Sequence, residues 1–129
     1  MDTIGDFLTR IRNAKMATHE KVDVPASKMR VNICQILQDN GYIKSFKAVK
    51  DDKQGMMRVY LKYDDGGQSS IISVERVSRP GRRVYVKAKD VPQVRQGYGI
   101  AVLSTSKGLM SNLDAAKMNV GGEWLFTVW

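Results

Sequence analysis

The sequence predicts a mixed α/β fold of the α+β type, built from two small subdomains. Apolar residues recur at helical spacing in the first 40 residues, and strand-like segments dominate from residue 42 onward. The run Asp-Asp-Gly-Gly at residues 64–67 interrupts the strand-rich part of the chain and is the expected boundary between the two subdomains. We therefore expect an N-terminal α-β-α-β-β subdomain over residues 1–64 and a β-rich C-terminal subdomain with one short helix over residues 65–129.

The first element is predicted to be a helix that begins near Thr3. Thr3 with Asp6 resembles a capping box in which Asp replaces Glu, and Asp2 suits the positive end of the helix dipole. The apolar residues that follow at helical spacing are Ile4, Phe7, Leu8, Ile11 and Ala14. Arg10 and Arg12 fall off this stripe, so we expect them to face solvent or a partner.

A short strand at residues 21–24 and a second helix come next. Pro25 ends the strand, and Ser27 is a good N-cap for the helix. The residues expected on the buried face of this helix are Met29, Ile33, Ile36 and Leu37. Asn40 and Gly41 supply its C-terminal stop, because glycine adopts the left-handed conformation without a Cβ clash.

The rest of the chain is predicted to be mostly strand. Two strands at residues 42–50 and 56–63 are joined by a polar turn at residues 51–55. Four further strands are expected at residues 71–77, 83–86, 100–103 and 123–128. A helix of one to three turns is expected from about Leu109, and Gly121 with Gly122 forms the turn before the last strand.

Charge and composition limit the classes of function. The net charge of +8 and pI of about 9.7 favour a polyanionic partner, nucleic acid first and an anionic membrane surface second. A basic protein without such a partner is the alternative. No apolar run reaches the roughly 20 residues that span a bilayer, and the first residues are acidic, so we expect a cytoplasmic protein. The single cysteine fits a reducing compartment.

Enzyme and metal sites are not predicted. His19 is the only histidine and lies in a polar segment, so an exposed loop position is expected. Cys34 lies in the middle of the second predicted helix, where a buried thiol packs as a small hydrophobic group. One cysteine and one histidine do not make a zinc site, and Ser106-Lys107-Gly108 reverses the order of a phosphate-binding loop. We expect no cofactor.

A run of three hydroxyl side chains is the strongest candidate site. Ser104, Thr105 and Ser106 precede Lys107 and Gly108 at the expected start of a helix. Free backbone N–H groups at a helix N-terminus favour anions, and small hydroxyls donate and accept hydrogen bonds at close range. An ordinary N-cap is the alternative, although one hydroxyl suffices for that role.

A basic stretch precedes the hydroxyl run. Its cations are Arg76, Arg79, Arg82, Arg83, Lys87, Lys89 and Arg95, with Tyr85 among them and Tyr98 just beyond. Cations that meet phosphates, interleaved with a ring that stacks, are typical of an RNA-binding surface, and a solvated basic face is the alternative. Lys28 and Arg30 oppose the dipole of the second helix by about 0.3–1 kcal/mol each. A bound anion would relieve this conflict, or the side chains point away.

The sequence resembles the family of the eighth protein of the bacterial small ribosomal subunit over essentially its whole length. The matching segments are residues 6–14 (DFLTRIRNA), 24–28 (VPASK), 76–81 (RVSRPG), 99–110 (GIAVLSTSKGLM) and 121–123 (GGE). Two segments depart from the family pattern. Residues 111–117 carry less charge than usual, and the tail at residues 124–129 is unusually aromatic.

The resemblance implies a two-part structural ribosomal protein that is not an enzyme. It implies direct binding, early in assembly, to a distorted stem in the central domain of small-subunit (16S) rRNA, beside neighbouring small-subunit proteins. The family places its main RNA contacts at Ser104, Thr105 and Ser106, with Lys107 and Gly108 beside them. Contacts from the N-terminal half would involve Arg10, Arg12, Lys28 and Arg30.

Three other functions are considered beside that of a structural ribosomal protein. Some members of the family also repress translation by binding their own messenger, and both roles are compatible in one chain. An enzyme or small-molecule binder on a basic α/β scaffold is disfavoured by the scarcity of histidine and cysteine. A pure protein-interaction module would need an acidic partner to match this charge.

Overall fold

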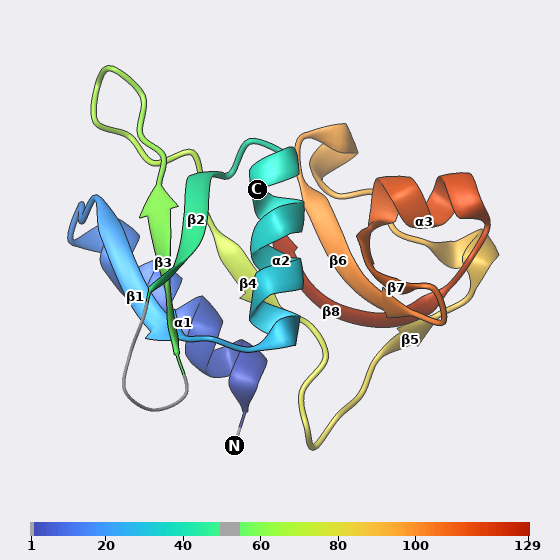
Figure 1. The fold of residues 1–129 in the computed structure, drawn as a ribbon. Coiled ribbons are helices and arrows are strands. Elements are labelled where there is room, and N and C mark those ends of the chain that lie inside the picture. Colours follow the sequence, from blue (N-terminus) through green and yellow to red (C-terminus); the bar gives the residue numbers. More distant parts are fainter. Residues whose placement is uncertain (1, 50–54) are drawn as a thin grey trace. The chain divides into compact units, whose positions relative to one another are not determined.

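The computed structural model describes residues 2–49 and 55–129 (Figure 1). The chain divides into two compact units, Met1–Ile72 and Ser73–Trp129. The glycine-containing break at residues 64–67 is a turn inside the first unit, in which Gly67 N donates to Asp64 O at 2.9 Å. The chain then folds back, and Ser70 N donates to Lys62 O at 2.9 Å. This return keeps residues up to Ile72 with the first unit.

The first unit has the predicted order α-β-α-β-β. Its elements are α1 (Thr3–Met16), β1 (Lys21–Pro25), α2 (Lys28–Asp39), β2 (Ile43–Val49) and β3 (Met56–Leu61). The strands form an antiparallel sheet in the order β1-β3-β2. α1 contacts β1 and α2 contacts β2, so the core lies between the helices and one face of the sheet. The predicted turn at residues 51–54 and strand end at residue 50 lie outside the described residues.

The two helix starts differ from the sequence expectation at one position. Asp2, not Thr3, is the N-cap of α1, and its carboxylate accepts a hydrogen bond from Gly5 N at 3.0 Å. A carboxylate adds a favourable charge to the capping hydrogen bond at the positive end of the dipole. Ser27 is the N-cap of α2, as predicted, and its hydroxyl accepts from Arg30 N at 3.1 Å.

The buried face of α2 was predicted only in part. Ile33 and Leu37 are buried as expected, whereas Met29 is 38% exposed. The buried stripe is completed by Arg30 and Cys34, one turn apart from the other two. These positions share one helix face, which places Met29 beside that face.

The second unit is rich in strands. Its elements are β4 (Val74–Arg76), β5 (Tyr85–Val86), η1 (Ala88–Asp90), η2 (Arg95–Gly97), β6 (Ile100–Thr105), β7 (Gly108–Ser111), α3 (Asn112–Met118) and β8 (Gly122–Val128). The antiparallel sheet has the order β4-β8-β6-β7, and β5 also pairs with β8. A small core of Leu103, Met110 and Ala115 is closed by partly buried side chains that include Trp124. The mixed α/β prediction is therefore confirmed.

The last predicted helix begins three residues later than expected. Residues from Leu109 to Ser111 belong to β7, which pairs with β6, and α3 starts at Asn112. Ser111 caps α3 by accepting a hydrogen bond from Asp114 N at 3.2 Å. The strands expected at residues 71–77 and 83–86 are also shorter, at Val74–Arg76 and Tyr85–Val86. Among the described helices, none is long and apolar enough to cross a membrane.

Candidate RNA-binding site

The hydroxyl run lies in a tight β-hairpin. Ser104 and Thr105 end β6, Ser106 and Lys107 form the turn, and Gly108 begins β7. The predicted position at a helix N-terminus is therefore wrong, because three residues of β7 separate Gly108 from α3. Gly108 has a φ of 109°, which an L-residue with a side chain rarely adopts. The hairpin presents the hydroxyls by its turn geometry and not through a helix dipole.

The three hydroxyls of this hairpin are not equivalent. Thr105 Oγ1 accepts a hydrogen bond from Lys107 N at 3.1 Å and donates one to Gly108 O at 2.8 Å. Its hydroxyl therefore holds the turn together. Ser106 and Lys107 are exposed at the tip, and Ser104 is partly buried. Ser106 is thus the hydroxyl of the run most open to a partner.

Cross-strand pairing places Ser104 in a row with two residues that are distant in sequence. Ser104 of β6 pairs with Glu123 of β8, and Glu123 pairs with Tyr85 of β5. Directly paired residues in a sheet point to the same side, so the three side chains share one face. Tyr85 is 69% exposed. The structure therefore brings the predicted Tyr85 and the predicted hydroxyl hairpin onto one surface.

Glu123 organises the basic turn beside this row, a role that the sequence analysis did not detect. Its carboxylate accepts hydrogen bonds from Ser78 Oγ at 2.5 Å and from Arg83 Nη1 at 3.0 Å. Ser78 is buried, and its Oγ also accepts from Val84 N at 3.2 Å. Partial burial works to raise the pKa of Glu123, but the hydrogen bonds from Ser78 and Arg83 hold that pKa below its ordinary value.

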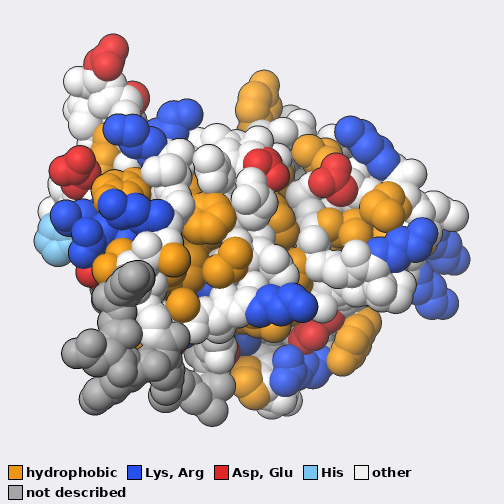
Figure 2. Space-filling model, in the orientation of Figure 1, with side chains coloured by type: hydrophobic (Ala, Val, Ile, Leu, Met, Phe, Trp, Pro, Cys, Tyr) orange, Lys and Arg blue, Asp and Glu red, His pale blue; other side chains and the backbone are white. Residues whose placement is uncertain are grey.

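The guanidinium of Arg83 is therefore partly used in the ion pair with Glu123. Arg79 and Arg82 lie in an exposed turn. Their backbones exchange two hydrogen bonds of 2.9 Å, and both residues are exposed. The two arginines line a hollow together with Arg76 and Glu75. Figure 2 shows Lys and Arg side chains gathered over the end of the second unit where Figure 1 labels α3, β5 and β7. Lys87, directly after β5, is also exposed.

Two glycines allow β8 to approach the back of the hairpin. A Cβ on Gly122 would overlap the backbone carbonyl of Ser104, and one on Gly121 would overlap the carbonyl of Val86. The sequence predicts only a turn at these two glycines. In the structure Gly122 begins β8 and pairs with Thr105. The absence of a side chain at the two glycines therefore allows the backbone of β8 to lie close to the backbone of the hairpin.

The predicted site residues of the first unit fall into two groups. Lys28 and Arg12 are exposed, and Arg10 is half-exposed with an ion pair to Asp6 at 3.1 Å. Arg30 is 4% exposed. Its guanidinium donates to Pro25 O at 2.8 Å and to Asp6 Oδ2 at 3.1 Å, and a further hydrogen bond reaches the carbonyl of residue 3 at 3.1 Å.

Arg30 is therefore part of the core of the first unit and not of its surface. The part of the charge conflict at the start of α2 that is due to Arg30 is compensated by Asp6 within the protein. The sequence predicts an RNA contact for Arg30 as for Lys28, and the burial of Arg30 contradicts this prediction. Only the packing of α1 against α2 distinguishes the two cations.

Cys34 and His19 lie where the sequence predicts them. Cys34 is fully buried, and burial raises its thiol pKa to about 12, so the thiol packs as an apolar group. His19 is exposed beside the turn after α1. Within the described part of the chain, no group of three or more His, Cys, Asp or Glu side chains is arranged to hold a metal ion.

Comparison with known proteins finds matches that cover essentially the whole chain. The sequence model of the family "Ribosomal protein S8" matches residues 2–129. A relative in Bdellovibrio bacteriovorus, named small ribosomal subunit protein uS8, is 60% identical over 129 residues, which cover both chains completely. Proteins of the same name in Geotalea uraniireducens and Streptococcus pneumoniae are each 51% identical over 99% of this chain and 97% of their own. The resemblance seen in the sequence motifs is thereby confirmed, and the chain belongs to the Ribosomal protein S8 family.

Proposed function

We propose that this chain is a structural protein of the small ribosomal subunit that binds small-subunit rRNA directly through its second unit. Membership of a ribosomal protein family confirms the expectation that the chain is not an enzyme. The observation that carries the proposal is the surface formed by the hydroxyl hairpin and the row Ser104–Glu123–Tyr85. A net charge of +8 supplies the attraction to a polyanion.

The surface suits recognition of RNA shape. The deep, narrow groove of A-form RNA hides base edges, so proteins recognise distorted or unpaired places where base edges and 2′-hydroxyls are accessible. The Ser106 hydroxyl and the partly buried Ser104 both donate and accept, which matches 2′-hydroxyls and base edges. The Tyr85 ring offers a stacking surface, and Lys107, Arg79 and Arg82 offer charges to the neighbouring phosphates.

The proposed RNA is a distorted stem in the central domain of 16S rRNA, bound early so that the protein helps to organise that domain beside neighbouring ribosomal proteins. In the first unit, Lys28, Arg10 and Arg12 are proposed as secondary contacts, and Arg30 is left out because it is buried. The same surface would bind the protein's own messenger if that messenger contained a similar distorted stem. Competition between such a messenger and the rRNA stem measures this directly.

The test compares a stem fragment from the central domain with a regular duplex of equal length across a salt series. We expect tight binding to the fragment and weak binding to the duplex. If about five phosphates are neutralised, log K should fall with log salt at a slope between about −3.5 and −4.5. Equal affinity for the two RNAs at every salt concentration would contradict the proposal, because it would leave only attraction to phosphate.

A further inference from the structure

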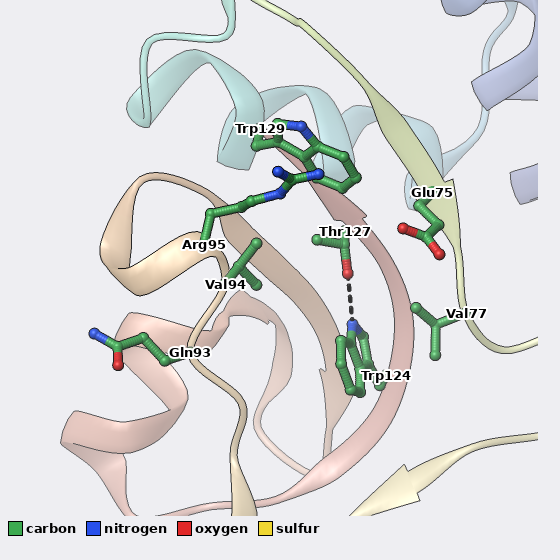
Figure 3. A pocket seen from close by; sticks show the side chains of 8 residues that line it. All are labelled: Glu75, Val77, Gln93, Val94, Arg95, Trp124, Thr127 and Trp129. Carbon is green, nitrogen blue, oxygen red and sulfur yellow. Dashed lines mark hydrogen bonds between the residues drawn. The ribbon is translucent and has the colours of Figure 1, made fainter.

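The aromatic tail of the chain lines a hollow on the second unit that the proposed rRNA surface does not use. The cavity has a volume of about 270 Å³. Figure 3 shows Trp124, Thr127 and Trp129 of the β8 segment, with Glu75 and Val77 of the neighbouring β4 segment beside them. These are the only two tryptophans in the chain. Thr127 pairs with Glu75 in the sheet, so their side chains share the face that the hollow occupies.

The Thr127 end of the hollow lies away from the hydroxyl hairpin, whereas its Trp124 end pairs with Leu103, the residue before Ser104. Thr127 pairs with Ala101 near the start of β6, whereas the hairpin follows Thr105 at its end. At about 3.3 Å per residue, the two places are roughly 13 Å apart along the strand. A ligand in the hollow is therefore a contact separate from the hairpin.

One wall of the hollow is held in an unusual backbone conformation. Arg95 and Gln96 both have positive φ angles, of 47° and 55°, which are uncommon for residues with side chains. Gly97 N and Gly99 N both donate to Val94 O, at 2.9 and 3.3 Å. A Cβ on Gly99 would lie 2.8 Å from Val128 O, so the loop closes tightly on the end of β8. Such strain persists where packing over-determines it, often at binding sites.

This loop places a guanidinium flat on an aromatic ring. The Cζ atom of Arg95 lies 4.2 Å from the centroid of the Trp129 ring, a cation–π stack visible in Figure 3. Stacking leaves the N–H groups at the edge of the guanidinium directed sideways, where a phosphate or base edge accepts them. Trp124 Nε1 donates to Thr127 Oγ1 at 3.1 Å, which fixes the second ring on the far side of Thr127 from Trp129 (Figure 3).

The polar groups of the hollow include both acceptors and donors. The exposed carboxylate of Glu75 accepts hydrogen bonds, and the exposed guanidinium of Arg95 donates them. Aromatic walls with a few polar groups at their edge match a planar heterocycle that has N–H and carbonyl groups on its rim. The volume lies just below the range of about 300–1,000 Å³ for drug-sized ligands, so it fits one ring system and not a folded peptide.

We infer that this hollow binds one unpaired nucleobase of an RNA strand, stacked against the tryptophan and arginine walls and recognised at its edge by Glu75. The inference rests on the RNA binding proposed above and adds a second contact to it. Adenine, cytosine and guanine carry amino groups that donate to a carboxylate, whereas uracil offers a single ring N–H. The hollow should therefore discriminate against uracil. Arg95 would neutralise the phosphate next to the bound base.

Both tryptophans line the hollow, so intrinsic tryptophan fluorescence of the full chain reports on this site. Titration with the single-stranded tetranucleotides AAAA, CCCC and UUUU should quench this fluorescence saturably, with UUUU the weakest ligand. Stacking on aromatic side chains is worth about 1–3 kcal/mol per base, so removing one wall should weaken binding about tenfold. Free nucleoside monophosphates should bind more weakly, because they lack the neighbouring phosphates.

Three variants connect the signal to the hollow. Glu75→Gln should lose the discrimination against UUUU, and Arg95→Gln should weaken all three tetranucleotides about tenfold. Both residues are exposed, so these variants are expected to fold. Trp124 packs against the small core, which makes its removal a poorer test. Glu20→Gln, an exposed carboxylate of the first unit that lines neither the hollow nor the hairpin, is the matched control and should leave the tetranucleotide titrations unchanged.

The outcomes separate this inference from the proposed rRNA binding. Stem binding with no fluorescence change for any RNA would overturn the hollow as a base site and leave the hairpin proposal intact. Quenching by tetranucleotides without preferential binding to the stem would support the hollow as a base site and overturn the hairpin proposal. Equal quenching of the wild type and both the Glu75 and Arg95 variants would also overturn the inference. Quenching by an arginine-rich peptide and by none of the RNAs would overturn it, because the hollow would then bind a peptide. Nucleoside monophosphates that bind as tightly as the tetranucleotides would also overturn it, because the site would then not require an RNA strand.

Discussion

At the scale of single residues, the hairpin separates two roles that look alike in sequence. The Thr105 hydroxyl is used within the turn, by Lys107 N and Gly108 O, whereas the Ser106 side chain is exposed. A run of three hydroxyls contains no information about which of them faces the partner. Turn geometry decides this, because the direction of each side chain depends on the strand pairing around it.

The first prediction compares these two hydroxyls. Ser106→Ala should weaken binding to the rRNA stem by about 1–3 kcal/mol, because an RNA group loses its partner, with unfolding unchanged. Thr105→Val should instead lower the free energy of unfolding by about 1 kcal/mol through the lost turn hydrogen bonds. Stem titrations and urea unfolding of both variants measure the two effects. A destabilised Ser106→Ala variant with normal affinity would contradict the assignment.

The second prediction concerns two neighbouring cations of α2. Arg30→Ala should destabilise the protein by about 2 kcal/mol, because it removes one of the two ion pairs of Asp6 and leaves two backbone carbonyls without this donor. Lys28→Ala, on the exposed side of the same turn, should leave stability within about 0.5 kcal/mol. Thermal unfolding of the pair measures the difference. Equal stability of the two variants would show that the buried guanidinium has no structural role.

At the scale of elements, the start of β8 supports the hairpin by close backbone approach. Gly122 lies against the carbonyl of Ser104, and no side chain fits between them. The third prediction is that Gly122→Ala costs about 1–3 kcal/mol of stability and also weakens stem binding, since β8 must move away from β6.

The control for this variant is Gly81→Ala. Gly81 has open space around its Cβ position and lies in the turn between Arg79 and Arg82. Calorimetric unfolding should show little change for Gly81→Ala and a clear loss for Gly122→Ala. If the two variants unfold alike, β8 does not require the close approach at Gly122.

Glu123 joins β8 to the turn that carries Arg83, and its titration gives the fourth prediction. Its pKa in the folded protein is lowered from an ordinary value of 4.5. A carboxyl with a lowered pKa stabilises the fold above its unfolded pKa, and this stabilisation is lost as pH falls through the folded pKa. Stability should therefore decline below about pH 4.5 more steeply in the wild type than in Glu123→Gln. Urea unfolding between pH 7 and pH 3 measures it, and parallel curves would contradict the role of Glu123.

At the scale of the whole molecule, the basic charge is distributed over both halves. Residues 1–64 carry twelve Lys and Arg against eight Asp and Glu, and residues 65–129 carry nine against five. Such a distribution attracts RNA without specifying where it binds. Specificity has to come from a defined surface, and the hairpin with its neighbouring strands is the surface proposed for that role.

The fifth prediction separates attraction from specificity. Replacing Arg79 and Arg82 together by glutamine should reduce the salt slope of stem binding by about 1.5–2, because two phosphate contacts are lost. The preference for the stem over the regular duplex should change little, since phosphate contacts carry no sequence information. Lys117→Gln, on the exposed side of α3, is the control for charge alone. An unchanged slope in the double variant would remove these arginines from the interface.

The sequence by itself determined the fold class, the element order of the first unit, the N-cap of α2 and the buried cysteine. These features depend on local spacing, on capping residues and on apolar periodicity, which the chain carries without reference to distant residues. The family could also be recognised, because its motifs are long and lie in order along the chain. The hydroxyl run was identified for the same reason, although its setting was mistaken for a helix start.

Only the tertiary structure decided which of these residues share a surface. The pairing of Ser104 with Glu123 and of Glu123 with Tyr85 joins three segments far apart in sequence. The burial of Arg30 depends on how α1 packs against α2. The hollow beside Trp124 and Trp129 depends on β4 and on the strained loop at Arg95. Side-chain direction and burial are set by contacts between distant segments, and a linear pattern of residue types does not contain those contacts.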